Sequence, residues 1–192
     1  MTRTAVARWI SVAFDSSALS LWLFPLVGWH AGRWAGLLWA VVAFLILTGL
    51  PLAYLLVGRR RGWVSDLELS DRRERPRFIA VSLGSDLLAL AVLWLGGAPR
   101  LVWAFALIYA CLGVTMLAIS SFWKISLHMV GVAGFATVLV YAFGPAWALG
   151  YLALLPVAWA RLERRKHTVP QLVAGAVAGT AITALVLWAV RP

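Results

Sequence analysis

The sequence has little cysteine, little acid and little charge of either sign, and each shortage excludes a class of protein. Cys111 is the only cysteine, so neither an intramolecular disulfide nor a cluster of thiolates around a metal is available. Asp and Glu number 7 against 17 Lys and Arg, which gives a formal net charge of +10. Charged residues make up only 12% of the chain, too few for a soluble domain. We therefore attribute the basic excess to phosphate handling and to orientation in a bilayer, not to nucleic acid.

Apolar side chains are abundant: they make up 63% of the chain, and its mean hydropathy is +0.90. These values are typical of an integral membrane protein. Apolar runs bounded by charge, Gly or Pro predict seven helices, at residues 8–29, 33–57, 78–96, 101–120, 128–143, 146–162 and 169–190. No separate soluble domain is left over. The sequence thus predicts one all-α membrane domain over residues 1–192, a polytopic bundle of six to seven transmembrane helices.

Turn signals separate neighbouring helices in this segmentation. The apolar run from His128 to Trp159 would measure ~48 Å as one helix, whereas the hydrocarbon core of a bilayer is ~30 Å thick. Gly144 and Pro145 interrupt this run and predict a tight turn. Residues 96–99, with two Gly and one Pro, predict another.

The distribution of Lys and Arg predicts an orientation. Seven crossings place three loops on the same side as the N-terminus, at residues 58–77, 121–127 and 163–168. All Lys and Arg lie on that side except Arg33, Arg100 and Arg191. The positive-inside rule then makes this basic face cytoplasmic and the protein a multi-pass protein of the cell membrane.

The first polar stretch, residues 63–77, alternates acids and arginines at helical spacing. Ser65 and Glu68 match a capping box, and charge pairs four residues apart predict a short surface helix that Pro76 ends. The functional alternative is that Arg75, at the membrane edge, binds a phosphate.

The second polar stretch, residues 122–128, directly precedes the fifth predicted helix. In one interpretation Ser126 caps that helix and His128 is a polar residue at the interface. In the other, Ser126 and the first N–H groups of the helix hold phosphate oxygens, while His128 protonates a leaving group. The dipole at the start of a helix favours an anion there.

The third polar stretch is a basic turn with Arg161 and His167 six residues apart. Arg grips phosphate oxygens as a permanently charged fork, and a neutral imidazole can attack phosphorus or move protons. Thr168 and Gln171 match a Thr-x-x-Gln capping box with Pro170 in the first turn. Gln171 therefore has a full structural explanation without catalysis.

Together the three stretches resemble the type 2 phosphatidic acid phosphatase (PAP2) superfamily of membrane lipid phosphatases. That family's pattern is Lys-x6-Arg-Pro, then Pro-Ser-Gly-His, then Ser-Arg-x5-His-x3-Asp. The resemblance covers roughly residues 60–180. It implies that His167 is the nucleophile, forming a phosphohistidine, and that His128 protonates the leaving alcohol. It also implies that Arg75 and Arg161 neutralise the phosphoryl oxygens, and that no metal or other cofactor is needed.

The sequence departs from the family pattern in all three stretches. Glu68 stands where the pattern has Lys, so Lys124, or one of Arg72 and Arg73, would supply the missing cation. Leu127 stands where Gly lets the backbone approach a ligand. Gln171 replaces the carboxylate, and its amide can fix the tautomer of His167 by accepting from Nδ1–H but offers no negative charge.

Three functions are consistent with these stretches. The first is a cytoplasm-facing phosphatase that hydrolyses a lipid phosphate or a prenyl (di)phosphate. The second is a membrane prenyl or alcohol-phosphate transferase, with Mg²⁺ held on a diphosphate by Asp66, Glu68, Asp71 and Glu74. The third is a non-catalytic relative that binds anionic lipid head groups through the same arginines.

Two further acids, Asp15 and Asp86, fall inside predicted helices, about two turns from the basic face. Ionisable groups inside membrane helices are often functional. Each could pair with an arginine or accept a hydrogen bond from a catalytic histidine, and the sequence favours structural pairing.

Overall fold

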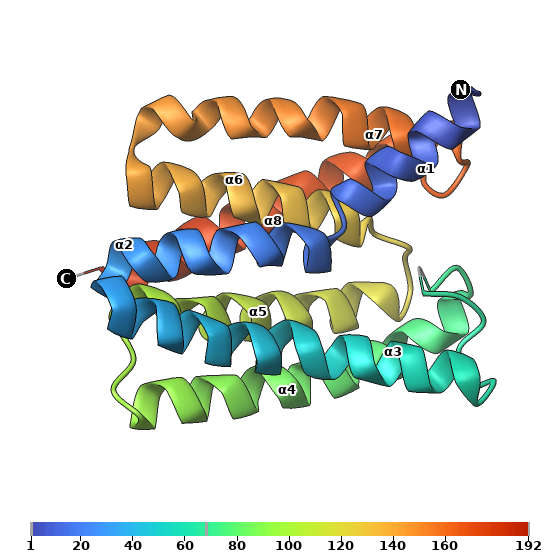
Figure 1. Cartoon of the computed structure of the whole chain (residues 1–192). Helices are drawn as coiled ribbons and strands as arrows, with labels where there is room; N and C mark the ends of the chain where they lie inside the picture. Colours follow the sequence, from blue (N-terminus) through green and yellow to red (C-terminus); the bar gives the residue numbers. More distant parts are fainter. Residues whose placement is uncertain (1, 68, 192) are drawn as a thin grey trace. The chain divides into compact units, whose positions relative to one another are not determined.

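The computed structural model describes residues 2–67 and 69–191, and every regular element within them is a helix (Figure 1). The chain forms two compact units. One combines the first 23 residues with the residues from Lys124 onward, and the other is Phe24–Trp123. In the described part of the chain, four helical elements are long and apolar enough to cross a membrane: Ser16–Arg60, Arg75–Leu95, Arg100–Ser120 and Val169–Ala189. The all-α fold is confirmed, with helices of the membrane-spanning type.

The first unit begins with two helices where the sequence predicts one. Helix α1 spans Arg3–Ala13, and α2 begins at Ser16. The break follows from Asp15, whose Oδ1 accepts a hydrogen bond from the backbone N–H of Ser17 at 3.0 Å. A short acidic side chain competes with the helix for backbone donors and favours the N-cap position. The unbroken helix predicted at residues 8–29 is therefore wrong.

The long element α2, Ser16–Phe44, reverses direction in the second unit. Gly32 and Arg33 have non-helical dihedral angles, with φ of 52° at Arg33. A Cβ built on Gly28 would lie 2.5 Å from Cβ of Ala40, so the two arms of α2 lie against each other. The break predicted between residues 29 and 33 is confirmed.

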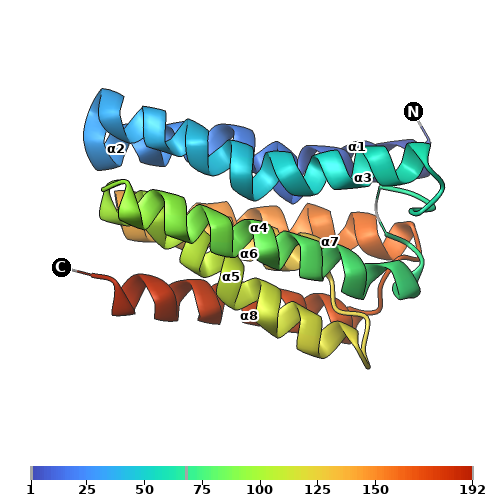
Figure 2. The ribbon, with the colours of Figure 1, turned by 90° about the horizontal axis from the view of Figure 1, so that it is seen from below.

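The rest of the second unit continues from this reversal. The second arm of α2 runs on through the π-helix η1, Leu45–Gly49, into α3, Leu50–Arg60 (Figure 2). After a loop come the short 3-10 helix η2, Arg72–Glu74, and the antiparallel helices α4, Arg75–Leu95, and α5, Arg100–Ser120. The turn predicted at residues 96–99 joins α4 to α5, and Gly97 adopts a φ of 76° there.

The short surface helix predicted within residues 63–77 is wrong, because among the described residues between α3 and α4 only η2 is helical. Glu68, the second half of the predicted capping box, lies outside the described residues. The carboxylate of Glu74 instead accepts hydrogen bonds from the N–H and Oγ of Ser65, at 2.9 and 3.2 Å. Pro76 lies in the first turn of α4, where its missing N–H costs no hydrogen bond.

The first unit resumes with α6, Leu127–Phe143, then the 3-10 helix η3, Pro145–Ala153, then α7, Leu154–Glu163, and α8, Val169–Ala189. Gly144 has a φ of 96°, and the tight turn predicted there is confirmed; Figure 1 shows the chain folding back between α6 and η3. The α-helix predicted at residues 146–162 is corrected in its first half, which is 3-10. Pro156 has no N–H for a carbonyl four residues back, which favours the tighter pattern before it.

Glycines let α6 and α8 approach closely. A Cβ on Gly175 would lie 2.6 Å from the carbonyl oxygen of Ser126 and 3.0 Å from Cβ of Met129. A Cβ on Gly179 would lie 2.9 Å from Cα of Val130. Small residues at such spacing bring membrane helices into backbone contact. This packing places the start of α6 directly against the start of α8.

The N-terminal helix α1 packs along α7 in the same unit. The guanidinium of Arg3 lies 3.6 Å from the carboxylate of Glu163, at the end of α7. The core of the unit includes Met129, Val157 and Leu172, buried residues from α6, α7 and α8. The N-terminus and the loop between α7 and α8 thus lie at the same end of this unit.

Candidate active site

The start of α8 holds a histidine in a defined orientation. The Oε1 atom of Gln171 accepts a hydrogen bond from the backbone N–H of Thr168 at 3.1 Å and lies 3.2 Å from Nδ1 of His167. The Thr168 N–H can only donate, so the amide atom facing it is the oxygen, and Nδ1 of His167 must then carry the proton it shares with that oxygen. In the neutral ring, the lone pair is therefore on Nε2.

The sequence offers two roles for Gln171, capping α8 and orienting His167, and the side chain is placed for both. The predicted capping box at Thr168 is confirmed, and Pro170 lies in the first turn of α8. The oxygen that completes this box also orients His167. One amide oxygen therefore serves both the helix and the imidazole.

The basic turn keeps an arginine and this histidine inside the unit. Arg161 lies in the last turn of α7 and is 2% exposed, and His167 is 8% exposed. The carbonyl of Arg161 accepts from the N–H of Lys166 at 3.0 Å, and Arg165 adopts a φ of 50° to close the turn. A permanent cation and an oriented imidazole thus occupy the two ends of one tight turn.

The second polar stretch meets the third at the start of α6. The N–H of Ser126 donates to the carbonyl of Gln171 at 3.3 Å. Ser126 occupies the N-cap position of α6, but its side chain makes no capping hydrogen bond. Its Oγ is fully buried and has no hydrogen-bond partner in the described part of the chain. Lys124, half-buried, lies on the segment that leads into this helix.

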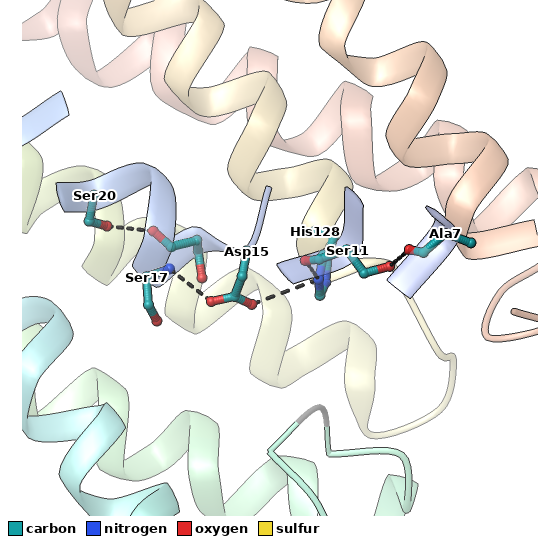
Figure 3. Close-up of polar contacts among 7 residues, drawn as sticks. Ala7, Ser11, Asp15, Ser17, Ser20 and His128 are labelled. Carbon is teal, nitrogen blue, oxygen red and sulfur yellow. Dashed lines mark hydrogen bonds and ion pairs between the residues drawn. The ribbon is translucent and has the colours of Figure 1, made fainter. Parts of the chain in front are cut away.

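His128, in the first turn of α6, contacts the break between α1 and α2 (Figure 3). Its Nε2 lies 3.1 Å from the carbonyl oxygen of Ser11 and 3.7 Å from Oδ2 of Asp15. A carbonyl oxygen only accepts, so Nε2 carries a proton. The sequence singles out Asp15 and offers a histidine as one of its two partners, but it favours structural pairing. It gives no signal for Ser11, whose contribution is a backbone carbonyl.

Arg75, the remaining predicted phosphate ligand, belongs to the second unit. Its side chain is 3% exposed, and its Nε donates to the carbonyl of Leu69 at 2.9 Å. Leu69 packs with Leu55 and Val64 in a small apolar cluster under the loop before α4. The guanidinium is therefore held by the fold at the start of that helix.

Of the four acids expected to hold Mg²⁺ in the transferase interpretation, the three that the structure describes accept hydrogen bonds within their own loop. The side chain of Asp66 accepts from the N–H of Ser70 at 3.4 Å, and that of Asp71 accepts from the N–H of Arg73 at 2.9 Å. Glu74 binds Ser65, as described above. In residues 2–67 and 69–191, no three His, Cys, Asp or Glu side chains are grouped so that they could hold a metal ion.

Comparison with protein-family models, with curated proteins and with solved structures finds no match to this chain. The chemistry of the site therefore follows from its own residues. These comprise a buried arginine, a histidine with a defined tautomer, a buried serine at a helix start and a second histidine beside a carboxylate.

Proposed function

We propose that the protein is an integral membrane lipid phosphatase that hydrolyses a lipid phosphate or prenyl (di)phosphate through a phosphohistidine intermediate. The observation that carries this proposal is the hydrogen bond from His167 Nδ1 to Gln171 Oε1, which keeps the lone pair of the ring on Nε2. A nucleophilic histidine needs that tautomer. The buried guanidinium of Arg161 on the same turn supplies a positive charge for phosphoryl oxygens.

The proposed reaction has two steps. Nε2 of His167 attacks phosphorus, the bond from phosphorus to the lipid oxygen breaks, and His128 gives a proton to the departing alkoxide. Water then attacks the phosphohistidine, its proton passes to His128, and inorganic phosphate leaves as the P–N bond breaks. Arg161 neutralises the phosphoryl oxygens, and the Oγ of Ser126 offers them a donor.

The hydrogen bonds of the acids in the loop before α4 favour the phosphatase over the transferase. Asp66, Asp71 and Glu74 each accept a hydrogen bond from a backbone N–H of their own loop, and these N–H groups compete with Mg²⁺ for the carboxylate oxygens. A non-catalytic protein that binds anionic head groups would use the same arginines as the phosphatase. An assay of phosphate release distinguishes the two functions.

The proposal includes six to seven membrane crossings with the polar site on the cytoplasmic side of the cell membrane. The reversal at Gly32 and Arg33 supports counting the element Ser16–Arg60 as two crossings. Helix α6 has 17 residues and spans about 25 Å at 1.5 Å per residue. The 9 residues of η3 and the 10 of α7 together span about 33 Å. Both lengths suit a hydrocarbon core of ~30 Å.

The decisive experiment measures phosphate release by the purified full chain in detergent, with EDTA present, from phosphatidate and from prenyl phosphates and diphosphates. We expect hydrolysis by the wild type and losses of at least ~100-fold in His167→Ala and His128→Ala. His30→Ala, which removes the third histidine, is the matched control and should keep wild-type turnover.

Each alternative has its own outcome in this assay. Activity that EDTA abolishes would favour the transferase. Binding of phosphatidate vesicles without phosphate release would favour the head-group protein. Near-wild-type turnover by His167→Ala would rule out the phosphohistidine, whatever the fold.

A further inference from the structure

The two histidines of the site have different partners. His167 shares its proton with a neutral amide oxygen, that of Gln171. His128 directs Nε2 at the carbonyl of Ser11, with a carboxylate oxygen of Asp15 at 3.7 Å from the same nitrogen (Figure 3). The carboxylate of Asp15 thus lies beside the histidine that the proposed reaction uses as an acid.

The carboxylate of Asp15 is held in place by the break between α1 and α2. Its Oδ1 caps α2 through the N–H of Ser17, which leaves Oδ2 directed at His128. The carbonyl of Ser11 belongs to the last full turn of α1, and the Oγ of Ser11 bonds back to Ala7 at 2.9 Å. The break thus presents a carbonyl oxygen and a carboxylate oxygen to the same ring nitrogen, Nε2 of His128.

We propose that Asp15 is a positioning residue for His128 in the hydrolysis of alkyl phosphates, an inference that rests on the proposed function. Its negative charge stabilises the imidazolium form, and the Ser11 carbonyl holds the Nε2 proton. The proton given to the leaving alkoxide therefore comes from Nδ1. In that step the P–O bond breaks, the P–N bond to His167 forms, the Nδ1 proton moves to the alkoxide oxygen, and His128 is left neutral with its proton on Nε2.

In this arrangement His167 lies beside a neutral amide and His128 lies beside a negatively charged carboxylate. A nucleophile must be neutral, and a general acid must be charged before it acts. Gln171 gives His167 an orienting oxygen without charge, while Asp15 gives His128 a charge. The missing carboxylate at position 171 is then compatible with hydrolysis, because the carboxylate in this chain supports the acid.

The rate that is lost when a general acid is impaired depends on how much the leaving group needs a proton. A glycerol alkoxide is a poor leaving group and needs a proton as the P–O bond breaks, whereas 4-nitrophenolate departs without one. Loss of Asp15 should therefore slow cleavage of phosphatidate and leave cleavage of 4-nitrophenyl phosphate nearly unchanged. A purely structural role would slow both substrates alike.

The test compares wild type with Asp15→Asn, using the purified full chain, and measures the first turnover as alcohol or 4-nitrophenol release. Asn is also a favourable N-cap, so the bond to Ser17 is kept. We expect a loss of about 10- to 100-fold on phosphatidate, part of the ~10²–10⁴-fold that general acid catalysis contributes, and a loss of less than ~3-fold on 4-nitrophenyl phosphate. Glu163→Gln is the matched control, a carboxylate-to-amide change in the same unit, and should change neither rate.

A second measurement tests the contact between Asp15 and His128 and does not depend on catalytic activity. The chain has three histidines, so ¹⁵N-histidine NMR in detergent can follow His128 after assignment with His128→Ala. We expect its ring signals to change in Asp15→Asn and to stay the same in Glu163→Gln.

The outcomes distinguish this inference from the proposed function. Equal losses on both substrates, or no loss on phosphatidate, would overturn the role of Asp15 while hydrolysis by the wild type upholds the proposed function. Unchanged His128 signals in Asp15→Asn would overturn the pairing itself. Wild type that cleaves neither substrate would overturn the proposed function and the catalytic role of Asp15 together.

Discussion

Replacing Gln171 by Glu tests whether the site is catalytic or merely a helix cap, because it adds a charge and keeps the geometry. Gln and Glu have the same length, so the Glu oxygen can still accept from the N–H of Thr168 and from Nδ1 of His167, now 3.1 and 3.2 Å from Gln171 Oε1. Asp, one methylene shorter, is a poorer test, since it would have to give up one of the two contacts.

The size of the effect follows from the two hydrogen bonds. A hydrogen bond to a charged group is worth about 1.5–3 kcal/mol, against about 0.5–1.5 for a neutral pair. Nδ1 gains positive charge as Nε2 bonds to phosphorus, so about 1.4 kcal/mol of the difference can appear in the transition state, which is a tenfold faster first turnover. At the Thr168 N–H, a carboxylate at a helix start adds about 0.3–1 kcal/mol of stability.

The assay pairs single-turnover hydrolysis of phosphatidate with thermal unfolding in detergent for wild type, Gln171→Glu and Gln171→Met. Met has a similar length but no acceptor oxygen, so it should lose both hydrogen bonds, about 1 kcal/mol of stability for each, and most of the activity. If Gln171→Glu unfolds at a higher temperature but turns over no faster than wild type, Gln171 is a cap and our account of His167 is wrong.

The remaining predictions concern packing and topology. Gly179→Leu should push α8 away from α6 and cost about 1–3 kcal/mol of stability, together with activity, because its Cβ would meet the backbone of α6. Gly84→Leu is the control, since a Cβ there meets nothing within 4 Å; equal destabilisation by both would contradict the close packing of α6 and α8. In a Cys111→Ala background, Arg100→Cys, at an exposed position beside the turn at residues 96–99, should react with an impermeant thiol reagent from outside the cell, and Asp66→Cys only from the cytoplasm. Labelling of position 100 from the cytoplasm would refute the orientation derived from seven crossings.

Local features of the fold follow from the sequence where a few neighbouring residues decide them. The turns at Gly97 and Gly144 need a positive φ that glycine adopts at little cost. The capping box of α8 joins Thr168 and Gln171, which are three residues apart. The same holds for the all-α class, because long apolar runs have to satisfy their backbone groups within the helix.

Sequence patterns failed where composition is compatible with two local structures. Apolar residues near Pro145 suit a 3-10 helix as well as an α-helix, and the structure has the former. The charged stretch before α4 has helical spacing, but Glu74 bonds to Ser65, nine residues earlier, and the loop closes instead. The apolar pattern around Asp15 is compatible with the interior of a helix. In the structure Asp15 is instead the N-cap of α2, and it divides the first predicted helix into two.

The site itself required the tertiary structure, because its contacts join residues that are distant in sequence. His128 and Ser11 are 117 positions apart, and no spacing rule links them. The sequence by itself determined which residue types have the chemistry, and it placed His167, Arg161 and Gln171 on one short turn. Only the packing of α6 against α8 brought Ser126 to Gln171, and only the break between α1 and α2 brought a carboxylate to His128. The physical reason is that hydrogen bonds within a turn depend on the local backbone, whereas contacts between helices depend on which faces pack together.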